Sequence, residues 1–167
     1  LYHTYVRDTL LTSSFARKYE RWDLSRPGKR SPGFRAPDVD GNVHTLADFR
    51  GKYVYIDMWA TWCGPCKREM PYLKALEEKF ADAQIVFLGL SVDKDKAAWE
   101  KMVGEGNMTG VQLYLGAQSS FMDAYRVEGI PRFILLDKEG VIISNDMSRP
   151  SEDATAVALG KLQGIRN

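Results

Sequence analysis

Hydrophobic and polar residues follow one another along this chain in blocks that predict strands separated by helices. Two nearly continuous apolar runs, at 53–59 and 85–92, have the length and composition of buried strands. Apolar residues at helical spacing predict a helix over 63–81. The remaining expected elements are helices at 94–103, at 119–125 and from about Ser151 as N-cap, and strands at 111–115, 132–137 and 141–145. The pattern is typical of an α/β fold with a mixed central sheet that ends in a hairpin.

The first 32 residues have a different character. Apolar residues at helical spacing between Leu11 and Trp22 predict an amphipathic helix, more plausibly one that caps the core than one that binds a partner. Three prolines and two glycines in 25–37 indicate a linker or irregular arm. We therefore divide the chain into an N-terminal amphipathic helix and linker, 1–32, and an α/β domain, 33–167.

Charge and hydropathy narrow the functional classes. The formal net charge is +1 over 167 residues, which argues against nucleic-acid binding as the main function. No stretch approaches the roughly 18 apolar residues of a membrane-spanning helix. No basic region followed by an apolar core opens the chain, so we see no signal peptide. Either one was removed or the chain is a piece of a longer polypeptide.

The chain contains two cysteines, Cys63 and Cys66, three positions apart. A bridge at this spacing closes a very short loop and would stabilise the fold little, so we expect the pair to serve chemistry. The expected strand-to-helix junction places Cys63 at a helix N-terminus, which favours its reactive thiolate form. Cys66 follows one turn later and can attack a mixed disulfide formed at Cys63. Gly64 and Pro65 allow the chain to enter the helix tightly between the two sulfurs.

The hexapeptide Trp-Cys-Gly-Pro-Cys-Lys at 62–67 is the thioredoxin active-site sequence, and the chain resembles the thioredoxin superfamily. Asp57 stands where thioredoxins carry a buried aspartate, and Pro71 where a proline kinks their active-site helix. Gly129-Ile130-Pro131 stands where they carry a cis-proline that faces the disulfide.

Further stretches at 33–38, 46–52 and 91–93 resemble the TlpA/ResA-like proteins of bacterial envelopes. This resemblance implies a thioredoxin fold with a helix/strand segment inserted between the second core strand and the cis-proline. It also implies a location in the periplasm, or on the membrane facing the periplasm. It further implies that the protein acts as a reductant. The expected partners are disulfide-containing protein substrates and an upstream electron-donating thiol protein. We expect no cofactor or metal beyond the Cys63–Cys66 disulfide.

Asp57 is the expected proton relay. A carboxyl group in an apolar strand is costly to ionise, so its pKa should be raised. Such a group could accept the proton of Cys66 when that sulfur attacks. The alternative is a structural aspartate that hydrogen-bonds nearby backbone.

A second set of residues is expected to contact substrate. In the family the cis-proline, here Pro131, packs against the disulfide, and the backbone of the preceding residue pairs with the substrate chain. Arg132 departs from the usual small residue at its position and could alter substrate choice or stabilise the Cys63 thiolate. The expected substrate-contacting residues are Trp62, Gly64, Pro65, Ile130 and Arg132.

Other functions are weaker matches. A zinc site needs four ligands, and no second cysteine pair exists. A peroxiredoxin-like peroxidase would have threonine three residues before the reactive cysteine, where this chain has Ala60. A non-catalytic docking module would not need an intact pair. Within disulfide chemistry, a disulfide oxidase or isomerase is the alternative to a reductase, and the Gly64-Pro65 dipeptide favours the reductase.

Overall fold

The strand β3 (Tyr53–Trp59) lies at the centre of a five-stranded sheet in the computed structural model, which describes residues 24–106 and 108–165. All seven residues of β3 are buried, as expected for a strand with helices on both faces. The strand order is β5-β4-β3-β6-β7, and a separate two-stranded sheet pairs β1 with β2. This mixed α/β architecture confirms the fold class predicted from the sequence.

The remaining elements follow the predicted order along the chain. The other strands are β1 (Arg35–Pro37), β2 (Val43–Thr45), β4 (Ile85–Ser91), β5 (Val111–Tyr114), β6 (Arg132–Leu136) and β7 (Ile142–Ser144). The helices are the 3-10 helix η1 (Leu46–Phe49), α2 (Gly64–Lys79), α3 (Lys96–Gly104), α4 (Ser120–Ala124) and α5 (Asp153–Gly160). The segment from α3 to α4 is the expected insertion between the second core strand, β4, and Pro131.

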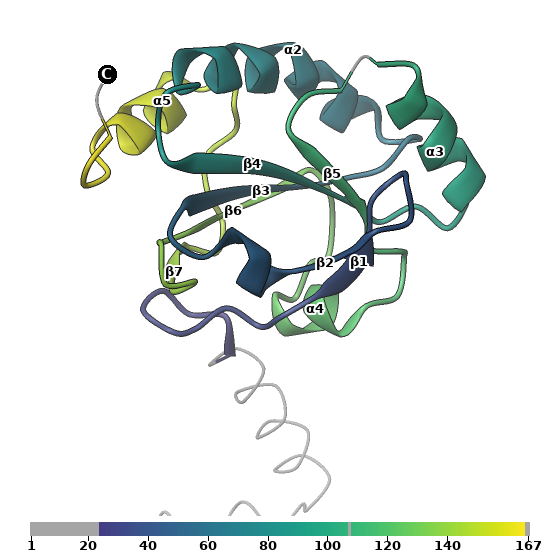
Figure 1. Ribbon diagram of the computed structural model, residues 1–167, viewed down its shortest axis with the longest axis horizontal. Coiled ribbons are helices and arrows are strands. Elements are labelled where there is room, and N and C mark those ends of the chain that lie inside the picture. The colour runs from purple at the N-terminus through teal and green to yellow at the C-terminus, as the bar shows by residue number, and fades with distance from the viewer. Residues whose placement is uncertain (1–23, 107, 166–167) are drawn as a thin grey trace, which may run out of the picture.

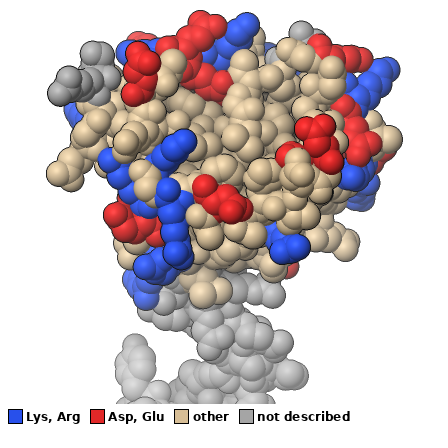
Figure 2. Space-filling model, viewed as in Figure 1, with Lys and Arg blue, Asp and Glu red and all other residues tan. Residues whose placement is uncertain are grey.

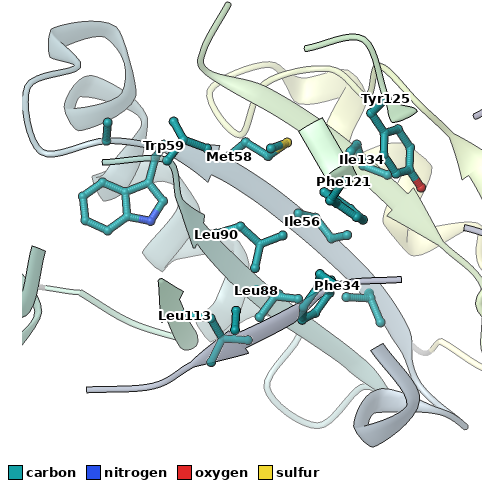
Figure 3. Close-up of a cluster of buried hydrophobic side chains, with 14 of the residues drawn as sticks. Phe34, Ile56, Met58, Trp59, Leu88, Leu90, Leu113, Phe121, Tyr125 and Ile134 are labelled. Carbon is teal, nitrogen blue, oxygen red and sulfur yellow. The ribbon is translucent and has the colours of Figure 1, made fainter. Parts of the chain in front are cut away.

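Two hydrophobic layers enclose the sheet. Helices α2 and α5 cover one face, and η1, α4 and the β1–β2 pair lie on the other (Figure 1). The layer under α2 and α5 contains Tyr55, Leu73 and Leu159. The opposite, larger layer joins side chains from β3, β4, β5, β6 and α4 with Phe34 and Tyr125, and Figure 3 labels several of them, among them Ile56 and Phe121.

Strand direction determines where loops meet. β3 and β4 are parallel, whereas β6 runs antiparallel to β3. The carboxyl ends of β3 and β4 and the amino end of β6 therefore lie at one edge of the sheet. The loop after Trp59, the loop after Ser91 and the turn before Arg132 are brought together there, although they are far apart in sequence.

One expectation about local structure is wrong, and a second holds in one of its two forms. Ser151 does not cap the last helix: α5 begins at Asp153 with Glu152 as N-cap, because Ser151 binds Glu69 instead. The segment 25–37, expected to be a linker or irregular arm, is an irregular arm joined to the core, since β1 lies within it and residues 28–31 hydrogen-bond to the 140–142 segment. The predicted N-terminal helix lies outside the described residues, and the division at residue 32 stays a prediction.

Acidic and basic side chains are interspersed on the face seen in Figure 2, as the near-zero net charge suggests. Within 24–106 and 108–165, no helix has the length and apolar character needed to cross a membrane.

Candidate active site

Cys63 and Cys66 form a disulfide where the chain passes from β3 into α2. Cys63 is the N-cap of α2, and its sulfur accepts a hydrogen bond of 3.2 Å from the backbone N–H of Cys66. An N-cap atom satisfies a helix donor that otherwise lacks a partner, and the helix dipole there favours negative charge. When the pair is reduced, the same donor stabilises a thiolate at Cys63. The sequence predicted this placement, with the helix itself starting at Gly64.

The surroundings of the disulfide are exposed on one side and closed on the other. Cys63 and Cys66 are buried, whereas Gly64 and Pro65 between them are exposed. Trp62 is 68% exposed, an unusual state for tryptophan, and thus offers an aromatic surface beside the disulfide. Trp59 is fully buried in the core, as predicted. A cleft of about 500 Å³ borders this surface and is lined by Thr61, Trp62, Val92, Asp93, Lys94, Asp95, Ala98 and Ala117.

Asp93, which follows β4, fixes the loop that carries the disulfide. Its buried carboxylate accepts hydrogen bonds from the Thr61 backbone N–H at 3.0 Å and from the Thr61 hydroxyl at 2.7 Å. The Ser91 hydroxyl donates a third bond at 2.7 Å. These donors replace the water that a buried carboxylate loses. The loop two residues before Cys63 is therefore held to the end of the neighbouring strand.

Asp57 is buried in the middle of the sheet and is poorly satisfied. Its side chain is 3% exposed, and its Oδ1 atom has no hydrogen-bond partner within the described part of the chain. Burial, followed by the negative charge of Glu69, raises the pKa of Asp57 to about 7. Because Oδ1 has no backbone partner within the described residues, the alternative of a purely structural aspartate is weakened. A carboxyl group with this pKa can exchange a proton near neutral pH.

Glu69 is a second buried carboxylate, on the inner face of α2 and one turn beyond Cys66. It accepts hydrogen bonds of 3.0 Å from both the backbone N–H and the hydroxyl of Ser151. The guanidinium of Arg149 lies 3.9 Å away. Glu69 therefore interacts electrostatically with Asp57 and lies on the same helix face as Cys66.

The third segment at this edge contains a cis Ile130–Pro131 peptide bond, as the resemblance implied. The Arg132 side chain is held by neighbours: one guanidinium nitrogen lies 3.4 Å from an Asp146 carboxylate oxygen, and another donates to the Tyr125 carbonyl. Its predicted contact with substrate or the Cys63 thiolate stays a prediction.

The sequence analysis missed Thr61, Glu69 and the structural role of Asp93. The available signal for Glu69 was an acidic residue on the apolar face of the expected helix, between Cys66 and Leu73. Within residues 24–106 and 108–165, no group of three or more metal-ligating side chains is arranged to hold a metal ion.

Residues 26–159 match the Redoxin family. The thiol-disulfide oxidoreductase ResA of Geobacillus kaustophilus is 34% identical over 115 residues, which cover 69% of this chain. The same residues span 66% of that relative, slightly less than two thirds of its length.

Solved structures show the same likeness in three dimensions. A candidate thiol-disulfide oxidoreductase from Bacteroides vulgatus, known from a solution structure, is 55% identical with a TM-score of 0.72 and covers 77% of this chain and 84% of its own. The thioredoxin domain of another thiol-disulfide oxidoreductase from Bacteroides vulgatus is 30% identical with a TM-score of 0.73. It covers 81% of this chain and 96% of its own.

We expect Asp93→Asn to lower the free energy of unfolding by about 2–3 kcal/mol, since an amide NH₂ would face the donors of Thr61 and Ser91. Urea denaturation measures this loss. Asp95→Asn is the matched control, because Asp95 is exposed and asparagine caps α3 nearly as well. Equal losses in both variants would show that the Asp93 network does not hold the loop.

The raised pKa of Asp57 predicts how stability depends on pH. The folded protein keeps the proton between the ordinary aspartate pKa, 3.8, and about 7, whereas the unfolded chain loses it. Stability therefore falls as pH rises through this range, by up to about 4 kcal/mol. In Asp57→Asn this loss is absent. The unfolding free energy of the variant minus that of wild type should therefore become more positive from pH 4 to pH 8. Parallel pH profiles for the two oxidised proteins would contradict the raised pKa.

Proposed function

Because this chain belongs to the Redoxin family, in the ResA-like group of thiol–disulfide oxidoreductases, we propose that it reduces protein disulfides through Cys63 and Cys66. The observation that carries the proposal is the position of Cys63 as N-cap of α2, with its sulfur bonded to the Cys66 N–H. That position lowers the free energy of a thiolate, which is the nucleophile in disulfide exchange. The two exposed residues between the cysteines leave the site open to a large substrate.

The reaction begins with the reduced pair. The Cys63 thiolate attacks one sulfur of the substrate disulfide, a bond forms between Cys63 and that sulfur, and the other substrate sulfur leaves as a thiolate. The Cys66 N–H and the N-terminal end of α2 stabilise Cys63 before the attack. Trp62 and the adjoining cleft contact the substrate chain, and the backbone of Ile130 pairs with it.

The second step frees the substrate. Cys66 loses its proton to the Asp57 carboxylate, and its sulfur attacks Cys63. The Cys63–Cys66 disulfide forms as the substrate sulfur leaves and takes up a proton. Two electrons pass from the cysteine pair to the substrate disulfide, and the enzyme ends in the oxidised state shown here. A base with a pKa of about 7 is matched to this transfer, since it can hold and release the proton near neutral pH.

The cysteine pair is the only redox group that this cycle requires, so we propose no further cofactor. A second thiol protein must reduce the Cys63–Cys66 disulfide after each turnover. We place the chain in the periplasm, free or membrane-tethered, on the basis of its resemblance to envelope proteins. The mixed surface charges favour no nucleic-acid partner.

We expect reduced Cys66→Ser protein to accumulate a mixed disulfide between Cys63 and a disulfide-containing protein such as insulin, because the resolving sulfur is missing. Cys63→Ser should form no such adduct, and turnover should fall about a thousandfold or more in both variants. Mass spectrometry identifies the adduct, and the double variant controls for nonspecific trapping. Adduct formation at Cys66 in Cys63→Ser, at the rate seen in Cys66→Ser, would reverse the assigned roles.

A further inference from the structure

The 126–131 loop connects α4 to β6 and has little support of its own. Its start is tied to α4, since the N–H of Val127 donates to the Met122 carbonyl at 3.0 Å. Residues 128–130 make no hydrogen bond within the described part of the chain. The backbone of Ile130 is therefore open to a partner, but its position depends on what holds the two ends of the loop.

Arg132 follows this loop and joins its two ends. It is the first residue of β6 and pairs with Met58 of β3, so both side chains lie on the face of the sheet under α4 (Figure 3). One guanidinium nitrogen donates a hydrogen bond of 3.4 Å to the carbonyl of Tyr125, which ends α4. Another lies 3.4 Å from a carboxylate oxygen of Asp146, beyond β7. Because Tyr125 directly precedes the loop and Arg132 directly follows it, their bond closes the loop at its base.

Tyr125 is itself a fixed point. It is 2% exposed, its ring centroid lies 4.8 Å from that of Phe121, and its hydroxyl oxygen lies 2.7 Å from that of Ser31. A residue held at its ring and at its hydroxyl keeps its carbonyl in place, because a packed interior leaves little free space. The Tyr125 carbonyl therefore gives Arg132 an acceptor that does not move with the loop.

The surroundings of Arg132 require these contacts. Its side chain is 24% exposed, and its Nε atom is buried without a hydrogen-bond partner among the described residues. Removing a guanidinium from water is costly unless its N–H groups are bonded elsewhere. Because the Asp146 side chain is 70% exposed, its ion pair with Arg132 is weak by itself. The planar guanidinium can serve the carbonyl and the carboxylate together, whereas the compact ammonium of a lysine lacks this fork.

We propose that Arg132 is a positioning residue, which closes the 126–131 loop and so holds the Ile130 backbone where a substrate chain pairs with it. The proposal rests on the function proposed above, in which that backbone binds the substrate as an added strand. Fixing a binding segment in advance reduces the entropy that is lost when the substrate binds. In this role Arg132 acts through the loop and needs no contact with the substrate or with the Cys63 sulfur.

The first test compares two disulfide substrates with the full chain. Insulin offers a peptide chain to the Ile130 backbone, whereas hydroxyethyl disulfide has no peptide group to pair. In Arg132→Met the KM for insulin should rise about tenfold with little change in kcat, the loss expected when a hydrogen bond that positions the binding backbone is removed. The rate with hydroxyethyl disulfide and the reduction potential of the Cys63–Cys66 couple should stay unchanged. An unchanged KM for insulin would overturn the proposal.

Arg50→Met is the matched control for this substitution. Arg50 is exposed and lies just before β3, at the opposite edge of the sheet from the disulfide. It should leave both substrates unaffected.

NMR relaxation of the backbone amides in the substrate-free protein tests the positioning itself. The order parameters of Gly129 and Ile130 should fall from about 0.85 in wild type to below about 0.6 in Arg132→Met. Arg132→Lys keeps the charge but loses the fork, so it should resemble Arg132→Met in both measurements. If the KM rises while the order parameters stay constant, or if lysine restores the wild-type KM, Arg132 acts by direct contact or by charge and the proposal is wrong.

Asp146→Asn provides a second variant if Arg132→Met does not fold. It removes the negative charge beside the guanidinium at an exposed position, so the KM for insulin and the mobility of the loop should rise by less than in Arg132→Met. Asp82→Asn, at an exposed position just beyond α2, is its control. Equal KM values and equal order parameters in these two aspartate variants would contradict the proposal.

Failure of this inference is distinguishable from failure of the proposed function. If wild type reduces neither insulin nor hydroxyethyl disulfide, the proposed function is wrong and this inference falls with it. If wild type reduces both, and Arg132→Met slows both equally with a shifted reduction potential, the function stands. Arg132 then acts on the thiol chemistry, and its role in positioning the loop is wrong.

Discussion

The site depends on one constraint, the direction of three neighbouring strands. β3 and β4 run parallel and β6 runs antiparallel to them, so the ends that carry the disulfide loop, Asp93 and Pro131 meet at a single edge. The helix α2 leaves from the same edge, and its N-terminus points at Cys63. A thiolate at Cys63 is thus stabilised by the backbone N–H groups at the start of α2, which the fold places beside the sulfur. This stabilisation needs no cationic side chain bonded to the sulfur.

Below that edge, the properties of each buried carboxyl group depend on whether it accepts hydrogen bonds from neighbouring donors. Asp93 is bonded by Thr61 and Ser91 and serves to hold the loop. Glu69 is bonded by Ser151, whereas Asp57 retains an oxygen without a partner and has a pKa raised to about 7. The same residue type is therefore a structural anchor at position 93 and, in the proposed reaction, the proton carrier at position 57.

Local patterns in the sequence were sufficient to predict the helices and strands of the domain and the position of the cysteine pair. The seven buried residues of β3 appear as an apolar run interrupted only by Asp57, and the strand-to-helix junction placed Cys63 at an N-terminus. Asp57 and the cis bond before Pro131 came from family resemblance. The contacts of Glu69 with Ser151 could not be foreseen, because they join residues 82 positions apart, and Ser151 was assigned to a helix cap by a local rule. Residues 28–31 were assigned to a linker for the same reason, since their partners lie in the 140–142 segment.

The most direct test of the account is the equilibrium reduction potential of the Cys63–Cys66 couple, measured in dithiothreitol or glutathione redox buffers. A reductase predicts a value near that of thioredoxin, about −270 mV. A value near that of the strong oxidant DsbA, about −120 mV, would contradict the account and assign the chain to disulfide formation.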